Sequence, residues 1–171
     1  AKALVEGGTD AIIIETQTAL EELEIGIAAA HEAGAKVVIG SVAFDRMVDE
    51  DDVRTMMGVS PERAAEFMAE HGCHIAGLNC GTGVDMRFAA DIVRRYIKTS
   101  GLPVMAQPNA GQPVLVNMQV QYNETPQEMS VGLPGVLAAG ARIVGGCCGS
   151  TPDHIRMFRK ILDRSVVKSC E

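Results

Sequence analysis

The sequence predicts an α/β fold of about five consecutive strand–helix units, a partial (β/α)8 barrel in one domain spanning residues 1–171. Three observations predict this fold. Short β-branched runs alternate with longer segments of helical period, and each run follows a glycine suited to the left-handed turn that ends a helix. Nearly every run also ends in polar or reactive residues.

Five strands are expected, and they are apolar almost throughout, as is typical of parallel strands covered by helices. Their ranges are Ala11–Glu15, Lys36–Phe44, Ile75–Cys80, Pro103–Gln107 and Arg142–Cys147. The glycines that precede them are Gly8, Gly34, Gly72, Gly101 and Gly140.

Five helices are expected after these strands, at about 19–33, 60–71, 85–99, 126–139 and 152–163. Three of the helix starts place a hydroxyl N-cap before a proline at the first helical position. These starts are Ser60-Pro61, Thr125-Pro126 and Thr151-Pro152. Glu128 completes a capping box with Thr125.

Periodicity alone leaves an open doubly wound sheet as an alternative to the barrel. The strand ends favour the barrel, because barrel enzymes build their sites from several strand ends at one face. These ends are Glu15-Thr16, Asp45, Asn79-Cys80, Gln107 with Asn109, and Cys147-Cys148. A barrel needs eight strands, so we expect a fragment whose open edges another segment or a second chain closes.

Composition excludes several classes of function. A net charge of −7, no Trp, two Tyr and four Phe argue against a nucleic-acid partner. No apolar run approaches the roughly 20 residues that span a bilayer, so no membrane partner is expected. Five cysteines without a secretion signal fit a reducing compartment, and we expect a cytoplasmic protein.

Three cysteines are predicted to meet at one rim of the sheet. Cys80 ends one strand, and Cys147 and Cys148 end another, immediately before a capped helix. Parallel strands would bring these sulfurs together as a three-thiolate zinc site, which leaves a fourth tetrahedral position open.

Other interpretations of the cysteines remain open at this point. A strand cysteine is often a small buried hydrophobe, which is our interpretation of Cys73, and Cys170 is expected to be an exposed incidental thiol. Gly145-Gly146 and Gly149-Ser150-Thr151 could instead cradle a phosphate at a helix N-terminus. Two adjacent cysteines, however, contribute nothing to phosphate binding.

The chain resembles the homocysteine S-methyltransferase family, which includes the homocysteine-binding barrels of cobalamin-dependent methionine synthase and of betaine-homocysteine methyltransferase. The resemblance runs from residue 1 to about 164 and rests on GGCCGSTPDHI at 145–155 and GLNC at 77–80. Supporting matches are Ile14–Thr16, Pro108–Gly111 and Tyr122–Pro126. It covers the five C-terminal βα units, strands 4–8 of the family's barrel, and the first three units have no counterpart.

The resemblance implies that Cys80, Cys147 and Cys148 ligate Zn²⁺ and that the homocysteine sulfur takes the fourth position. It also implies that Glu15 binds the substrate amino group, while Asn79 would orient the loop or a thiolate by hydrogen bonds. The expected reaction is zinc-dependent methyl transfer to the thiol of homocysteine, which gives methionine. The expected donor is methylcobalamin on a separate domain or corrinoid protein, or another activated methyl compound. The alternative is an inactive or partner-dependent zinc-binding half-barrel that acts as an assembly component.

Three weaker features complete the sequence analysis. The acidic segment Asp45–Gly58 lacks the spacing of a calcium loop, so we expect a solvated loop. His154 is expected to be structural. Gln107 and Asn109, at a strand end, are candidates for contact with substrate or donor.

Overall fold

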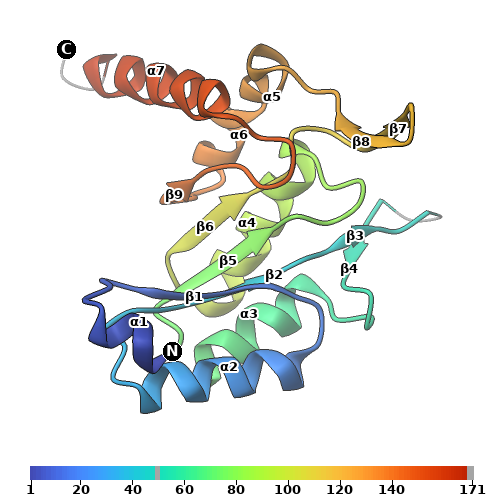
Figure 1. Ribbon diagram of the computed structural model, residues 1–171. Helices are drawn as coiled ribbons and strands as arrows, with labels where there is room; N and C mark the ends of the chain where they lie inside the picture. Colours follow the sequence, from blue (N-terminus) through green and yellow to red (C-terminus); the bar gives the residue numbers. More distant parts are fainter. Residues whose placement is uncertain (49–50, 169–171) are drawn as a thin grey trace.

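The computed structural model describes residues 1–48 and 51–168, with side chains up to Arg164. Its centre is a five-stranded sheet in the order β1-β2-β5-β6-β9, in which every neighbouring pair is parallel (Figure 1). The strands are β1 Ile12–Gln17, β2 Val38–Val42, β5 Ile75–Asn79, β6 Val104–Gln107 and β9 Ile143–Val144. Parallel pairing puts the carboxyl ends of all five strands at one edge.

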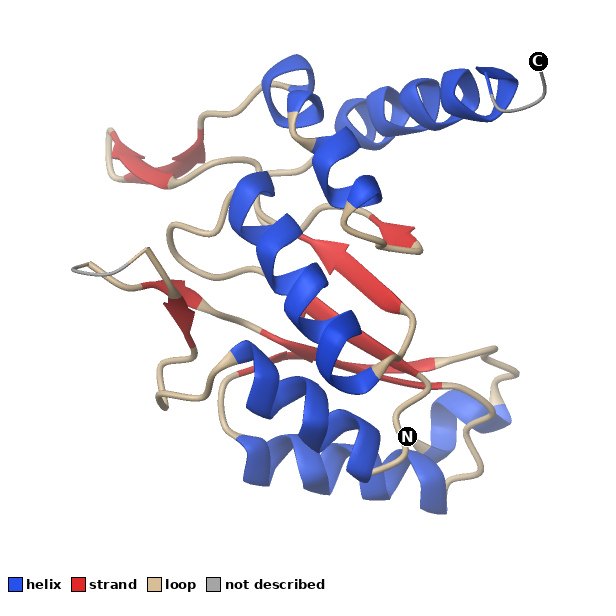
Figure 2. Ribbon diagram, turned by 180° about the vertical axis from the view of Figure 1, so that it is seen from behind, coloured by secondary structure: helices blue, strands red, loops and turns tan. Residues whose placement is uncertain are grey.

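Helices α2 (Leu20–Glu32), α3 (Pro61–Glu70) and α4 (Met86–Ser100) lie on one face of this sheet (Figure 2). Leu23, Met68 and Tyr96, one from each helix, are fully buried in the core. The remaining helices are α1 Lys2–Glu6, α5 Pro126–Val131, α6 Leu133–Ala138 and α7 Pro152–Lys168.

The alternation of strands and helices predicted from the sequence is confirmed. The five glycines expected to end helices all have positive φ, from 68° at Gly101 to 107° at Gly140. Ser60 caps α3 by accepting a hydrogen bond from the N–H of Arg63, and Thr125 with Glu128 forms the expected capping box on α5. Local sequence signals therefore decide where most of these elements begin and end.

The single helix expected at 126–139 is wrong, because α5 and α6 are separate helices. Pro134 lies in the first turn of α6 and has no N–H to donate to the carbonyl of Ser130, so a continuous helix is interrupted there. The last predicted strand is also shorter than expected. β9 ends at Val144, and Gly145–Cys147 belong to the loop that follows.

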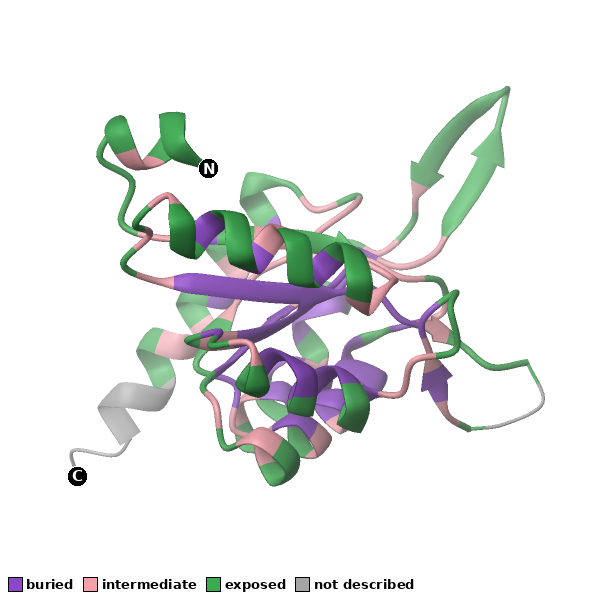
Figure 3. Cartoon of the chain, turned by 90° about the horizontal axis from the view of Figure 1, so that it is seen from below, coloured by how far each residue is buried: buried purple, intermediate pink, exposed green. Residues whose placement is uncertain are grey.

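Two antiparallel hairpins were not predicted. β3 (Asp45–Arg46) pairs with β4 (Val53–Arg54), and β7 (Pro113–Val116) pairs with β8 (Gln119–Tyr122). Figures 1 and 2 show both hairpins projecting from the same side of the molecule, and β7–β8 is almost entirely exposed (Figure 3). The solvated loop expected at Asp45–Gly58 therefore contains a small hairpin, although its Asp49 and Glu50 lie outside the described residues, as does Cys170.

Across the part of the chain that the structure describes, no helix has both the length and the apolar character needed to cross a membrane.

Candidate metal centre

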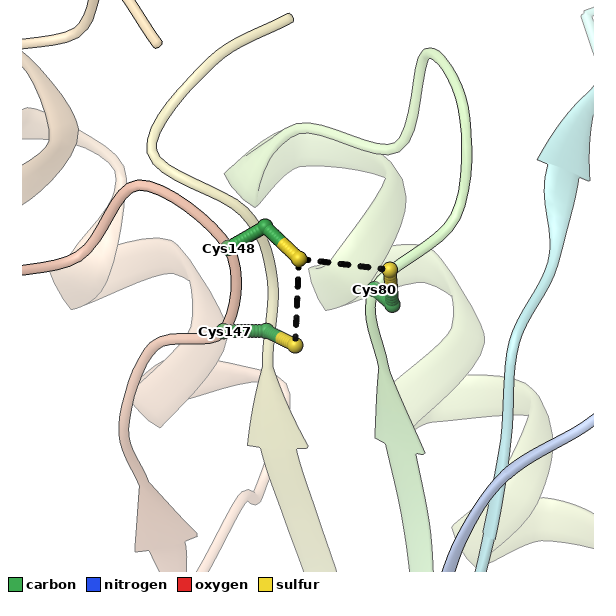
Figure 4. A group of neighbouring side chains, drawn as sticks. All are labelled: Cys80, Cys147 and Cys148. Atoms are coloured by element: carbon green, nitrogen blue, oxygen red, sulfur yellow. Dashed lines mark hydrogen bonds between the residues drawn. The ribbon is translucent and has the colours of Figure 1, made fainter. Parts of the chain in front are cut away.

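Three cysteine sulfurs converge at the carboxyl-terminal edge of the sheet (Figure 4). The Sγ of Cys148 lies 3.9 Å from that of Cys80 and 4.0 Å from that of Cys147. All three sulfurs lie within 4.8 Å of one another, and all three residues are partly buried. Cys80 follows β5, whereas Cys147 and Cys148 occupy the loop between β9 and α7.

These separations fit one tetrahedral metal ion. Zinc–thiolate bonds of about 2.3 Å at tetrahedral angles place sulfurs about 3.8 Å apart. The two closest pairs, at 3.9 and 4.0 Å, already have nearly this spacing. Three thiolates in this arrangement provide one face of a tetrahedron and leave the fourth position to another ligand.

Cys80 is held in place by an unusual local backbone. Its φ of 59° is rare for a residue with a side chain, and its N–H donates to the carbonyl of Gln107 at 3.3 Å. The next residue, Gly81, has φ +90°, and a Cβ there would lie 1.8 Å from the carbonyl oxygen of Phe44. Only glycine fits behind the cysteine.

Cys147 and Cys148 are fixed by the loop that follows β6. The N–H of Cys147 donates to the carbonyl of Pro108 at 2.9 Å, and the carbonyl of Cys148 accepts from Ala110, also at 2.9 Å. Because the pair lies beyond the end of β9, the alternation of strand side chains does not apply, and both sulfurs can face Cys80 (Figure 4).

Asn79 connects the first strand to the sulfur cluster. Its Nδ2 donates to Thr16 Oγ1 at 2.8 Å and lies 3.8 Å from Cys147 Sγ. Its Oδ1 accepts from the N–H of Thr16 at 3.0 Å and from Ser41 Oγ at 2.7 Å. The side chain is 2% exposed, so its amide is fully used within the protein.

Asn109 makes the corresponding connection on the other side. Its Nδ2 donates to the carbonyl of Gly81 at 3.0 Å and lies 3.8 Å from Cys80 Sγ, while its Oδ1 accepts from the N–H of Cys148 at 3.0 Å. Sequence reasoning placed Asn109 at the correct strand end, but its contacts with both cysteine loops could not be read from the sequence.

The electrostatics of the cluster favour a cation. Burial raises the pKa of the Cys147 thiol, the hydrogen bond from Asn79 opposes that shift, and neighbouring Cys148 and Cys80 raise the pKa further. The pKa of the Tyr122 hydroxyl is also raised, first by its hydrogen bond to Cys148. Three thiolates this close repel one another, and a divalent ion removes that repulsion.

A cleft of about 220 Å³ opens beside Cys80. Asn109, Tyr122 and Met56 are among the side chains that line it. The cleft therefore gives an incoming ligand access to Cys80.

The other predicted site residues lie at or near the same edge. Glu15 is exposed at the end of β1, next to Thr16, which contacts Asn79. Gln107 Oε1 is buried and, among the described residues, has no hydrogen-bond partner.

Cys73 is buried, and burial raises the pKa of its thiol to about 11, as suits a core residue.

The phosphate alternative finds little support in the geometry. The N–H of Ser150 already donates to the carbonyl of Cys147, and the N–H of Thr151 donates to His154 Nδ1. His154 is 4% exposed and also contacts the carbonyl of Glu124 through Nε2, which is a structural arrangement.

Comparison with known proteins decides the family. The model of the homocysteine S-methyltransferase family matches residues 1–162. The chain belongs to this family. Methionine synthases of Mycobacterium leprae (strain TN) and Mycobacterium tuberculosis (strain ATCC 25618 / H37Rv) are 33% and 32% identical over 158 residues. That alignment covers 91% of the chain but only 13% of each relative.

Solved structures confirm the fold of this family member as part of a barrel. The apo homocysteine methyltransferase MmuM from Escherichia coli superposes with a TM-score of 0.69 at 21% identity, over 93% of this chain and 52% of that protein. The carboxyl transferase domain of Rhizobium etli pyruvate carboxylase, a Y628A variant with pyruvate, gives 0.57 at 13% identity, over 86% and 23%.

Proposed function

We propose that this chain binds one Zn²⁺ through Cys80, Cys147 and Cys148 and activates the thiol of homocysteine for methylation to methionine. The observation that supports the proposal most strongly is the spacing of the three sulfurs, 3.9 and 4.0 Å for the two closest pairs. Bound zinc would hold the substrate sulfur as a thiolate, the nucleophilic form of a group that is mostly protonated at neutral pH.

The protein residues would orient the reacting groups. Asn79 and Asn109 direct amide N–H groups at Cys147 and Cys80, and these contacts would hold the two sulfurs in place as metal ligands. The exposed Glu15 carboxylate has no ion pair among the described residues and would bind the ammonium group of the substrate.

The methyl group would come from an activated donor, most simply a methyl-corrinoid carried by a separate domain or protein. The new carbon–sulfur bond forms as the bond between the methyl group and its carrier breaks, and that electron pair stays with the carrier. The thiol proton leaves to solvent when the substrate becomes a thiolate. The protein's main contribution is then to position donor and acceptor.

Exposed apolar residues on the two edge strands support a second candidate, an assembly role that needs a completing partner. Ile13 of β1 is 38% exposed and Ile143 of β9 is 41% exposed. Such edges are normally covered. In this alternative the chain binds zinc but is inactive until another chain or segment completes the barrel.

Turnover distinguishes the two candidates. The zinc-loaded chain is assayed for methionine formation from homocysteine with methylcobalamin or S-methylmethionine, alone and mixed with the three N-terminal βα units of a relative. Methionine formed by the chain alone and lost with Cys148→Ser supports the enzyme, whereas methionine formed only by the mixture supports the partner-dependent candidate. No methionine from either preparation contradicts the proposed activity.

A further inference from the structure

A residue with a strained backbone lies near the end of β1, directly after Glu15. Thr16 has a φ of 61°, in the left-handed region that β-branched residues rarely adopt. Among the described residues, three other non-glycine residues have positive φ: Asn117 and Met118 in the β7–β8 turn, and Cys80, a proposed metal ligand. Strain of this kind persists only where the surroundings enforce it, and it clusters at functional sites. What holds Thr16 in this conformation therefore bears on the adjacent Glu15.

A bulge in β1 accompanies the unusual conformation. Ile14 lies opposite Gly40 of β2, but Gln17 lies opposite Val42, so three steps along β1 match two along β2. Bulges of this type bend a strand and re-aim its side chains, and they are frequent beside active sites. Here the bulge takes Thr16 out of the β1–β2 ladder, and its N–H is free to bond elsewhere.

Asn79 binds both polar groups of Thr16. Its Oδ1 accepts from the Thr16 N–H at 3.0 Å, and its Nδ2 donates to Thr16 Oγ1 at 2.8 Å. The same Nδ2 lies 3.8 Å from Cys147 Sγ. Because Oδ1 also accepts from Ser41 Oγ and the residue is buried, the amide cannot turn without breaking several contacts. One fixed side chain therefore reaches from Thr16 to a sulfur of the cluster.

Glu15 is held between fixed neighbours. On one side, Ile14 packs against α2, where a Cβ added at Gly26 would lie 2.7 Å from Ile14 Cγ2. Neighbouring strand residues point to opposite faces, so Glu15 points away from α2. On the other side stands Thr16, and the carbonyl of Glu15 accepts from Gln17 Nε2 at 3.0 Å. The backbone of Glu15 is thus fixed, while its carboxylate is exposed.

The proposed substrate has two ends of different chemistry, a thiol for the metal and an ammonium group for a carboxylate, joined by a short carbon chain. We propose that Thr16 is a positioning residue: through Asn79 it sets the place of Glu15 relative to the cysteine cluster, and the site thereby selects thiols that carry an ammonium group. This inference rests on the proposed function, because it assumes zinc on the three cysteines and an ammonium group on Glu15.

The test measures thiol binding by calorimetry to the zinc-loaded full chain, so it does not depend on turnover. The probes are homocysteine and γ-mercaptobutyrate, which is homocysteine without its amino group. Thr16→Val removes the hydroxyl and keeps the β-branched shape, whereas Thr16→Gly removes the hydroxyl and accepts positive φ without strain. Both variants should bind homocysteine about tenfold more weakly, and their affinity for γ-mercaptobutyrate should change less than about twofold. Thr16→Ser keeps the hydroxyl and should restore homocysteine binding to within about twofold of wild type.

The matched control is Thr9→Val. Thr9 is exposed just before β1, and its Oγ1 donates to the carbonyl of Ala11 at 3.0 Å, so this variant also loses one hydroxyl hydrogen bond. Its affinity for both thiols should equal that of wild type, and zinc content should stay the same in every variant. In a Glu15→Gln background, Thr16→Val should have no further effect on homocysteine binding, because the two residues act through one contact.

Four results would overturn the positioning role. They are a wild-type chain that binds both thiols equally well, an equal loss of both thiols in Thr16→Val and Thr16→Gly, unchanged homocysteine affinity in these two variants, or the same loss with and without Glu15→Gln. A wild-type chain that binds no zinc, or that binds zinc but neither thiol, would instead reject the proposed function.

Discussion

The Sγ atoms of Cys80 and Cys148 lie 3.9 Å apart, although 68 residues separate them in the chain. The strands that precede them, β5 and β9, are not neighbours, because β6 lies between them, and this separates them by about 10 Å. The loop after β9 therefore bends over the end of β6. Hydrogen bonds from Cys147 N–H to the Pro108 carbonyl and from Cys148 N–H to Asn109 Oδ1 hold that bend.

Replacing one member of the cluster should remove the metal. Cys148→Ser is expected to reduce zinc from about one ion per chain to well below half, because two thiolates hold zinc poorly. Cys73→Ala is the control, since Cys73 is buried in the core and should not affect metal content. Metal analysis of dialysed protein checks this, and equal zinc in both variants would count against the cysteine site.

Asn79 should matter for stability as well as for metal binding. Asn79→Ala leaves the Thr16 N–H and the Ser41 hydroxyl without their acceptor, at a cost of about 2–4 kcal/mol, and should lower zinc affinity about tenfold or more. Ser41→Ala removes one hydrogen bond only and should cost about 1 kcal/mol. Urea unfolding and competition with a zinc chelator measure the two effects. Similar losses of stability and of zinc affinity in both variants would show that the Asn79 side chain does not join β1 and β2 to the cysteine cluster.

Replacing Gly81 by alanine should destabilise the protein far more than the same replacement of Gly58, a glycine of similar backbone conformation. Gly81 and Gly58 have φ of +90° and +81°, but an added Cβ at Gly58 meets nothing within 4 Å. Gly58→Ala should therefore cost about 1 kcal/mol from backbone strain alone. Gly81→Ala also collides with the Phe44 carbonyl, so we expect a loss of about 3 kcal/mol or more and displacement of Cys80. Urea unfolding and metal analysis of the two variants measure these effects. Equal stability of the two variants would contradict the close contact between residue 81 and the Phe44 carbonyl.

The Glu62–Arg95 pair should make stability depend on acid pH. The hydrogen bond from Arg95 is the largest effect on Glu62 and lowers its pKa from an ordinary 4.5 to about 2. A lowered folded-state pKa contributes stability that is present above pH 4.5 and is lost as the pH falls toward 2. Because Glu62 is half exposed, the contribution should be about 1 kcal/mol or less.

Urea unfolding from pH 6 to pH 2 tests this pair through Glu62→Gln. The variant should be less stable than wild type at pH 6, and the gap should close as wild-type Glu62 becomes protonated. A gap that stays constant across this range would show that the carboxylate charge is not the cause.

The sequence predicted the parts of the fold that local signals specify. Glycines at helix ends, the hydroxyl caps Ser60 and Thr125, and the Thr151-Pro152 pair mark element boundaries within a few residues. The β7–β8 hairpin was missed because its turn, at Asn117 and Met118, has positive φ at both residues without a glycine. In addition, β7 (Pro-Val-Leu-Val) lacks the alternation that identifies a half-buried strand, and only the four residues of β8 (Gln-Val-Gln-Tyr) show it.

In the candidate site, too, some features could be predicted from the sequence and others could not. The convergence of Cys80, Cys147 and Cys148 could be predicted, because parallel strands bring their carboxyl ends to one edge. The hydrogen bonds of Asn79 to Thr16 and Ser41 could not be predicted from the sequence, because they depend on the register of the strands β1, β2 and β5. A register shift in β1 between Ile14 and Gln17, with Thr16 at φ 61°, brings Thr16 within reach of Asn79.

X-ray absorption at the zinc edge, on the chain with and without homocysteine, tests the central claim most directly. The account predicts about one zinc per chain with three sulfur ligands and one lighter ligand, changing to four sulfur ligands at about 2.3 Å when homocysteine is added. Zinc with fewer than three sulfur ligands, or a coordination shell that homocysteine leaves unchanged, would contradict it.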